Sequence, residues 1–236
     1  MLDTDTKLLK PGLADREAKL TNPALPLEIA GLSLDAAAPL IMVDVDEVLA
    51  MFMRGFENFV VKSGYEMRIT RFALFQSVFP VGRSEPISMD TGKALFELFF
   101  REAAETMDAA PGAAEALRRL SARASVIVLS NAPDYAREGR RRWLDRWGFP
   151  YPMVLNNGPK GPAAAALAGM TTGPAAFIDD ILTHLESVAE AAPKVRRFQM
   201  IADTRLRPFA HSATDRHPRH DDWTEMEPAL AQGLGL

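Results

Sequence analysis

Residues 39–49 read PLIMVDVDEVL, an apolar run that ends in the acidic pair Asp44 and Asp46. A continuous apolar run of this length, followed directly by polar residues, is typical of a parallel strand that is buried on both faces. Residues two apart in a strand point the same way. If the extended geometry persists to its end, Asp44 and Asp46 face one site, where two such carboxylates require a cation or a shared proton.

The same pattern recurs later in the chain, because other apolar runs also end in polar residues. They are Ser125–Leu129 before Ser130 and Asn131, Pro152–Leu155 before Asn156 and Asn157, Ala175–Ile178 before Asp179 and Asp180, and Arg197–Ala202 before Asp203. Helical patterns lie between them, over Pro111–Ala122, Tyr135–Trp147 and Ile181–Ala192. Strands that alternate with helices predict a parallel sheet, whose ligands bind at the carboxyl ends of the strands.

The first two predicted strands are separated by a segment too long for one crossover helix. Nine of the thirteen phenylalanines fall in this segment, in three groups with mostly helical spacing: Phe52, Phe56 and Phe59; Phe72, Phe75 and Phe79; Phe96, Phe99 and Phe100. The spacing predicts a small helical insert over residues 51–107. The rings are expected to form its core, and the alternative is an aromatic wall that stacks a flat substrate group.

The composition is that of an ordinary globular protein. The chain has 236 residues, a net charge of −4 and no cysteine, which excludes disulfides and cysteine-based sites. The mild acidity gives no attraction to nucleic acid or to an anionic membrane. The first ten residues, MLDTDTKLLK, lack the apolar run of a secretory signal. We therefore expect a soluble, cytoplasmic protein.

The two ends of the chain show weaker patterns. Residues 1–38 are expected to form an extension on the core, with a short hairpin around Gly31 that uses Leu27, Ile29, Leu32 and Leu34. Residues 205–236 contain proline, histidine and charge without a period, which predicts an irregular tail packed on the surface. Six tail residues could form a metal site, but we favour a solvated tail: His211, Asp215, His217, His220, Asp221 and Asp222.

Four stretches resemble, in order, the signatures of the haloacid-dehalogenase-like hydrolase superfamily. They are Ile41–Leu49, Leu129–Asn131, the loop NGPKGP (157–162) around Lys160, and Phe177–Asp180. Four motifs in order are far more specific than any one of them. The resemblance spans residues 39–50 and 108–204. It implies an α/β fold, a Rossmann-like three-layer parallel sheet of strand order 5-4-1-2-3, with residues 51–107 as an inserted small helical cap.

The resemblance also implies an activity, that of the phosphatase branch with a small helical cap. Asp44 would attack phosphorus to form an aspartyl-phosphate. Asp46 would protonate the leaving oxygen and then activate water. Mg²⁺ would be held by Asp44, by the main-chain carbonyl of Asp46, and by Asp179 or Asp180, with a preference for Asp179.

The phosphoryl oxygens would be bound by Ser130 and Lys160, and Asn131 would help to orient them. The expected substrate is a small phosphomonoester, such as a nucleotide or a sugar phosphate. Dehalogenases of the superfamily lack an acid two residues after the nucleophile and its ion pumps carry threonine there, so Asp46 favours phosphate-ester chemistry.

Two alternatives remain open. One is a phosphotransferase or phosphomutase that uses the same aspartyl-phosphate, and the other is a noncatalytic binding or regulatory module with this fold. Glu47 is the best hint of the second, because the family often has glycine there, and glycine permits unusual backbone angles. Glu47 also adds negative charge, which would favour a cationic group on the substrate. The sequence does not reveal the oligomeric state.

Overall fold

The computed structural model describes residues 25–236, and a parallel sheet lies at their centre. Its strands are β1 (Leu40–Val43), β4 (Ser125–Ser130), β5 (Met153–Leu155), β6 (Ala175–Asp179) and β7 (Arg196–Gln199). They run parallel in the order β5-β4-β1-β6-β7. If these five strands are numbered 1 to 5 along the chain and the sheet is read from β7 to β5, the order is 5-4-1-2-3, as predicted. The strand that precedes Asp44 is therefore the central one.

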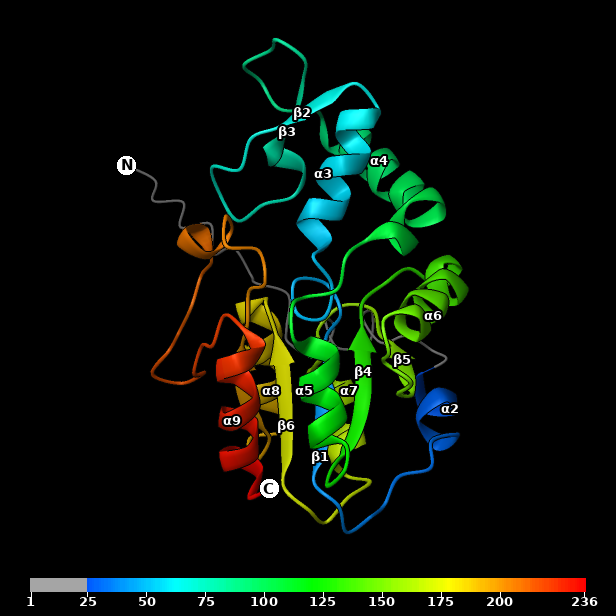
Figure 1. The fold of residues 1–236 in the computed structure, drawn as a ribbon, viewed down its shortest axis with the longest axis vertical. Helices are drawn as coiled ribbons and strands as arrows, with labels where there is room; N and C mark the ends of the chain where they lie inside the picture. The colour runs from blue at the N-terminus through cyan, green and yellow to red at the C-terminus, as the bar shows by residue number, and fades with distance from the viewer. Residues whose placement is uncertain (1–24) are drawn as a thin grey trace, which may run out of the picture.

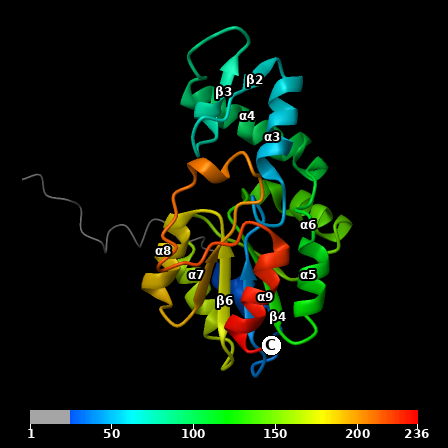
Figure 2. The same ribbon diagram turned by 60° about the vertical axis from the view of Figure 1, so that its left-hand side comes forward.

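Helices cover both faces of this sheet and make three layers (Figures 1 and 2). One face carries α5 (Ala113–Leu120), α6 (Arg137–Arg146) and α9 (Trp223–Leu234), and the other carries α2 (Leu25–Ala30), α7 (Gly161–Ala168) and α8 (Leu182–Ala191). Ile41 and Val43 of β1 belong to the apolar core on the face of α5, α6 and α9, whereas Leu40 and Met42 belong to the core on the face of α2, α7 and α8. Among the helices of residues 25–236, none combines the length and the hydrophobicity that a membrane span needs.

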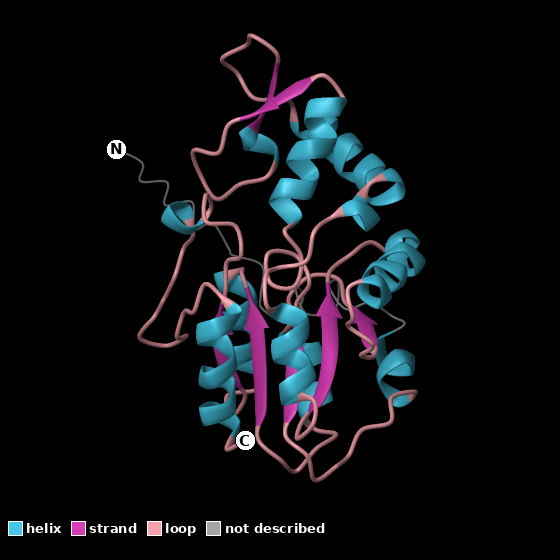
Figure 3. Ribbon diagram, viewed as in Figure 1, coloured by secondary structure: helices cyan, strands magenta, loops and turns pink. Residues whose placement is uncertain are grey.

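The insert, residues 51–107, lies beyond the carboxyl ends of the strands (Figures 1 and 3). Its elements are α3 (Phe52–Lys62), β2 (Tyr65–Met67), the 3-10 helix η1 (Phe75–Ser77), β3 (Val78–Pro80), α4 (Met89–Glu102) and the 3-10 helix η2 (Ala104–Thr106). The first and third phenylalanine groups lie on α3 and α4, as their spacing predicts.

The second phenylalanine group was predicted wrongly as a helix. Phe75 lies in a single 3-10 turn, and Phe79 lies in β3, where it pairs with Glu66 of β2. Val78 and Phe79 favour a strand, and Pro80 cannot continue a helix. The insert therefore carries a small antiparallel hairpin beside its two helices.

Aromatic rings hold the two helices of the insert together. The ring of Phe99 lies edge-on to those of Phe52 and Phe56, with centroids 5.5 Å and 5.4 Å away. All three side chains are buried. Edge-to-face pairs of buried rings stabilise a core beyond the area that they bury. These rings belong to a core, as we expected for the phenylalanine groups as a whole.

The segment that follows β7 packs against the insert. Ile201 and Leu206 pack against Met53 of α3 in a small apolar cluster. Beside it, a guanidinium nitrogen of Arg205 lies 2.6 Å from a carboxylate oxygen of Glu57, also on α3. The insert is thus joined to the sheet by this packing as well as by its two chain connections.

The prediction for the N-terminal end of the described residues was wrong, and that for the C-terminal end was right only in part. A hairpin at 27–34 is replaced by α2, because Leu25 and Ile29, four residues apart, are the buried residues, while Leu27 is 79% exposed. The first 24 residues of the predicted extension lie outside the described residues.

Residues 205–222 of the tail are irregular apart from a 3-10 turn at Arg207–Phe209, as predicted, but Trp223–Leu234 form the regular helix α9, despite Pro228 inside it. Asp222 caps this helix by accepting hydrogen bonds from the main-chain N–H groups of Thr224 and Glu225, at 2.9 Å and 3.0 Å. The buried residues recur every three or four positions along one face: Trp223, Met226, Leu230 and Leu234. His217 is also buried. The expectation of a solvated tail therefore does not hold for all of it.

Candidate active site

The carboxyl ends of the three central strands bring the predicted site residues together. Asp44 follows β1, and its main-chain N–H donates a hydrogen bond of 3.0 Å to the carbonyl of Ile178 in β6. Asp179 is the last residue of β6, and Ser130 is the last residue of β4 on the other side of β1. Lys160 directly precedes α7. Segments that are far apart in sequence thus meet at one edge of the sheet.

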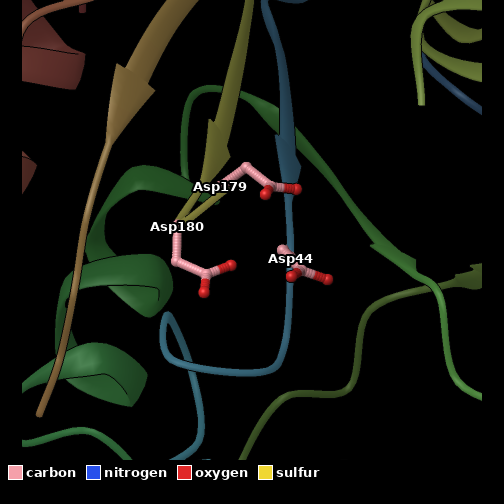
Figure 4. A group of neighbouring side chains, drawn as sticks. All are labelled: Asp44, Asp179 and Asp180. Carbon is pink, nitrogen blue, oxygen red and sulfur yellow. The ribbon is translucent and has the colours of Figure 1, made fainter. Parts of the chain in front are cut away.

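Three carboxylates converge at this edge, and they come from Asp44, Asp179 and Asp180 (Figure 4). One oxygen of each lies within 4.8 Å of the others. All three residues are buried. Within residues 25–236, this is the only group of three or more acids or histidines with a spacing that suits a metal ion. Carboxylate oxygens are the ligands that Mg²⁺ prefers, so the group fits such an ion.

Lys160 supplies a positive charge between two of these carboxylates. Its ammonium nitrogen lies 2.6 Å from Oδ1 of Asp44 and 2.7 Å from Oδ2 of Asp179, and its side chain has no exposed surface. Burial alone would lower the pKa of Lys160, but the two carboxylates hold it above its ordinary value. Lys160 therefore stays charged, and it offsets much of the repulsion between Asp44 and Asp179.

The three carboxyl groups differ in how readily they ionise. Burial raises the pKa of Asp44 to about 6, against the opposing effect of Lys160. Burial also raises the pKa of Asp180 well above its usual range, and the charges of Asp179 and Asp44 add to the increase. Burial acts in the same direction on Asp179, but Lys160 and His184 lower its pKa to about 2. Asp180 is thus the carboxylate that most needs a further cation.

The partners of Asp179 and Asp180 also differ. The Oδ2 atom of Asp179 accepts a hydrogen bond from Lys160, and its Oδ1 accepts one of 2.9 Å from the N–H of Ile181. Nδ1 of His184 lies 3.1 Å from the same Oδ1. By contrast, no hydrogen bond or ion pair to the Asp180 carboxylate is found in the described part of the chain. Asp180 therefore has the freer oxygens.

Asp46 does not join this group, because the extended geometry ends before it. The strand stops at Val43, and the carbonyl of Val45 accepts hydrogen bonds of 2.8 Å from both Leu49 and Ala50. This tight turn directs the Asp46 side chain toward α6. There its two carboxylate oxygens each accept a hydrogen bond of 2.9 Å from Arg140.

Ser130 and Asn131 follow β4 at the same edge. Ser130 is fully buried, and its hydroxyl oxygen accepts a long hydrogen bond of 3.3 Å from the N–H of Ala132. The side chain of Asn131 donates to the carbonyl of Gly158 and accepts from the side chain of Asn156, both at 2.9 Å. Asn131 therefore fixes the loop that carries Lys160.

Glu47 occupies the tight turn with a backbone conformation that favours glycine, at φ = 58°. Its carboxylate is buried and accepts hydrogen bonds from the N–H groups of Met53 and Asp203, at 2.7 Å and 2.9 Å. Met53 lies at the N-terminus of α3, where a negative charge is favourable. Glu47 therefore joins the sheet to the insert instead of presenting its charge to solvent.

The charge of Glu47 makes folding depend on pH. Burial raises its pKa from 4.5 to about 7, against the effect of the two N–H groups. Because the folded-state pKa is above the unfolded value, the folded protein binds this proton more tightly. Stability is therefore lost as the pH rises from about 4.5 to about 7, by roughly 3 kcal/mol from this group.

We expect Glu47→Gln to flatten this pH dependence. Urea unfolding of the metal-free protein at pH 5 and pH 8, with a chelator present, measures the difference for each variant. Wild type should lose more stability between the two pH values than Glu47→Gln. Glu102→Gln, at an exposed position on α4, is the control and should match wild type. If Glu47→Gln lost as much stability as wild type between pH 5 and pH 8, the pH dependence would not come from the Glu47 carboxyl.

Sequence reasoning missed two residues that contact this site. Arg140 lies in an arginine-rich stretch that reads as surface, yet it is spaced three and four residues before the buried Trp143 and Leu144. That helical spacing was the available signal. His184 is the second, and its contact with Asp179 has no signal in the sequence.

Comparison with known proteins supports the fold. No family model and no curated protein matches the sequence. A haloacid dehalogenase-like family hydrolase from Streptococcus pneumoniae superposes with a TM-score of 0.54 at 12% identity, over 83% of this chain and 99% of that one. A provisionally assigned beta-phosphoglucomutase from Thermotoga maritima gives a TM-score of 0.51 at 15% identity, over 82% and 99%. The chain therefore has the haloacid-dehalogenase-like fold that the four motifs predicted.

Proposed function

We propose that this chain, with its haloacid-dehalogenase-like fold, is a Mg²⁺-dependent hydrolase of small phosphomonoesters. The observation that carries the proposal is the buried Lys160, which lies between Asp44 and Asp179 beside the free carboxylate of Asp180. An isolated cluster of acids is common on proteins. A buried lysine that holds one of these acids at the end of the central strand is more specific, and it suits a carboxylate that acts as a nucleophile.

The described residues fit a magnesium ion. Asp44 and Asp180 would hold it through their side chains and Asp46 through its main-chain carbonyl, while Asp179 would chiefly hold Lys160. We prefer Asp180 to Asp179 as the direct ligand because both oxygens of Asp179 already have partners. When bound, Mg²⁺ offsets the repulsion between a carboxylate nucleophile and a phosphate dianion.

In the first step, an oxygen of Asp44 attacks phosphorus and the bond to the ester oxygen breaks. The leaving alkoxide takes a proton from Asp46, which yields the free alcohol and an aspartyl-phosphate. Lys160 has three N–H groups and contacts Asp44 and Asp179. No further acceptor for its ammonium is found in residues 25–236, so the third N–H group would donate to a phosphoryl oxygen. The Ser130 hydroxyl would donate to a second phosphoryl oxygen.

In the second step, water attacks the phosphorus of the aspartyl-phosphate. Asp46 takes the proton that the water loses and so returns to the protonated form that began the first step, while the bond to Asp44 breaks to release phosphate and restore the Asp44 carboxylate. Asn131 acts through the loop that it fixes, because it keeps Lys160 at the start of α7. These roles amount to positioning and charge stabilisation, which is the main requirement of phosphoryl transfer.

The insert would act as a cap over this site. Residues 39–50 and 108–204 would form the core, with residues 1–38 and 205–236 as additions to it. Closure of residues 51–107 would exclude water and select among small phosphorylated metabolites. Met53 of the insert packs on Ile201 and Leu206, so this contact lies between the two parts that would move.

Hydrolysis of para-nitrophenyl phosphate and a panel of sugar and nucleotide monophosphates tests the proposal. We expect turnover with Mg²⁺, and none after chelation until Mg²⁺ is restored. Phosphate that appears on a second hydroxyl of a sugar, instead of free in solution, would identify a phosphotransferase or mutase. The absence of turnover across the whole panel would contradict the proposal and favour a noncatalytic module.

Metal binding has its own test, which is independent of turnover. A ligand that binds only the folded state at 100 times its dissociation constant adds about 2.7 kcal/mol of stability. We expect Mg²⁺ to raise the melting temperature of wild type and to have a much weaker effect on Asp180→Asn. Asp215→Asn, a change of the same kind at an exposed position, is the control. An equal Mg²⁺ effect in all three proteins would contradict the metal site.

A further inference from the structure

Arg140 carries a buried positive charge that no step above uses. Its side chain is only 1% exposed, although the other four arginines of α6 are exposed or half-buried. Of the acids in the described part of the chain, only Asp46 lies within ion-pair distance of it. A buried charge is costly without a partner, so the fold holds Arg140 where Asp46 can meet it.

The contact between these two side chains is a matched fork. Nη1 of Arg140 donates to Oδ1 of Asp46 and Nη2 donates to Oδ2, each at 2.9 Å. Two parallel hydrogen bonds fix both the position and the plane of a carboxylate, which one bond cannot do. Each carboxylate oxygen has a second lone pair, and the Asp46 side chain is 27% exposed. Asp46 is therefore held in place with one side still open.

Arg140 also contacts the insert. Its guanidinium carbon lies 5.3 Å from the centroid of the Phe100 ring, near the end of α4. A guanidinium group over an aromatic face is attracted to it. The same side chain thus contacts Asp46 of the catalytic turn and Phe100 of the insert.

We propose that Arg140 is the positioning residue for Asp46 and ties its orientation to the insert. The inference rests on the proposed function, because it concerns the proton that Asp46 gives to the leaving oxygen. Asp46 lies at the start of the tight turn that Val45 and Ala50 close. Apart from the two bonds from Arg140, no side-chain hydrogen bond to its carboxylate is found in residues 25–236. Without Arg140 the carboxylate would rotate freely, and few of its orientations would face the leaving oxygen.

A comparison of two esters isolates this role. An alkyl phosphate needs a proton on its leaving oxygen, whereas 2,4-dinitrophenyl phosphate releases a stable anion and does not. General acid catalysis typically contributes about 10²–10⁴-fold. We expect Arg140→Met to lower kcat at least about tenfold on the alkyl ester and to change it little on the dinitrophenyl ester. A merely structural residue would lower both rates alike.

Two further variants keep the test sharp. Arg140→Lys retains the charge but not the fork, so it should show the same leaving-group dependence even if Arg140→Met folds poorly. Arg142→Met is the matched control, because Arg142 lies on the same helix and its partner Glu105 is in the insert. It should keep wild-type rates on both esters.

A double substitution completes the test. If Arg140 acts through Asp46, Asp46→Asn combined with Arg140→Lys should lose no more activity on the alkyl ester than Asp46→Asn alone. Equal losses on the two esters, or losses that multiply in the double variant, would overturn the inference while leaving the proposed function intact. A wild type that turns over neither ester would instead contradict the proposed function, and the inference with it.

Discussion

Asp44→Asn is expected to abolish phosphate-ester hydrolysis, with a loss of at least roughly 10⁴-fold in kcat. The amide cannot attack phosphorus, and it removes the negative charge that faces Lys160 at 2.6 Å. Steady-state turnover of para-nitrophenyl phosphate with saturating Mg²⁺ measures the effect. Residual activity within about tenfold of wild type would show that another group is the nucleophile.

The same variant should fold well. Asp44 lies among Asp46, Asp179 and Asp180, and burial already raises its pKa to about 6. Removal of its charge therefore relieves repulsion in the metal-free protein, so the melting temperature in chelator should stay level or rise. A lost activity combined with a retained fold separates a catalytic role from a structural one. A large drop in melting temperature would mean that Asp44 is chiefly a structural partner of Lys160.

Lys160→Met should have the largest effect on stability. The substitution leaves Asp44 and Asp179 buried without the ammonium group that joins them. Loss of one partner of a buried ion pair typically costs about 3–5 kcal/mol. We expect a loss of this size in urea unfolding at pH 7 with a chelator present, together with loss of hydrolysis.

The pH dependence of that loss identifies its cause. Without Lys160 the pKa of Asp44 should lie above its present value of about 6, so at pH 5 its carboxyl is protonated and the repulsion is reduced. The stability difference between Lys160→Met and wild type should therefore shrink from pH 7 to pH 5. Lys194→Met, at an exposed position, is the control and should resemble wild type. A difference that does not depend on pH would mean that lost packing, not lost charge, destabilises the variant.

Much of the fold could be predicted because burial leaves a direct mark on sequence. The strand before Asp44 reads as an unbroken apolar run because both faces of β1 are covered by helices. The polar residues after each run indicated the edge at which Asp44, Ser130 and Asp179 meet. The tail helix α9 was missed because Pro228 breaks the expected pattern, although the four buried residues on its inner face keep a helical period.

The finer features of the site depend on tertiary structure. The direction of the Asp46 side chain follows from the turn at Glu47, whose positive φ is not a preference of glutamate. Asp179 and Asp180 differ in their hydrogen-bond partners because Lys160, which lies in another segment of the chain, contacts Asp179. The sequence preference for Asp179 as metal ligand therefore changes in our proposal to Asp180, because free oxygens become visible only in the folded chain.

A crystal structure of the protein with Mg²⁺ and beryllium fluoride, which mimics a phosphoryl group bound to a carboxylate, tests the central proposal most directly. We predict that beryllium is bonded to a carboxylate oxygen of Asp44, with a fluoride near Lys160 and Mg²⁺ contacting Asp44 and Asp180. Beryllium bonded to another residue, or a metal ion far from the Asp44 carboxylate, would contradict the account.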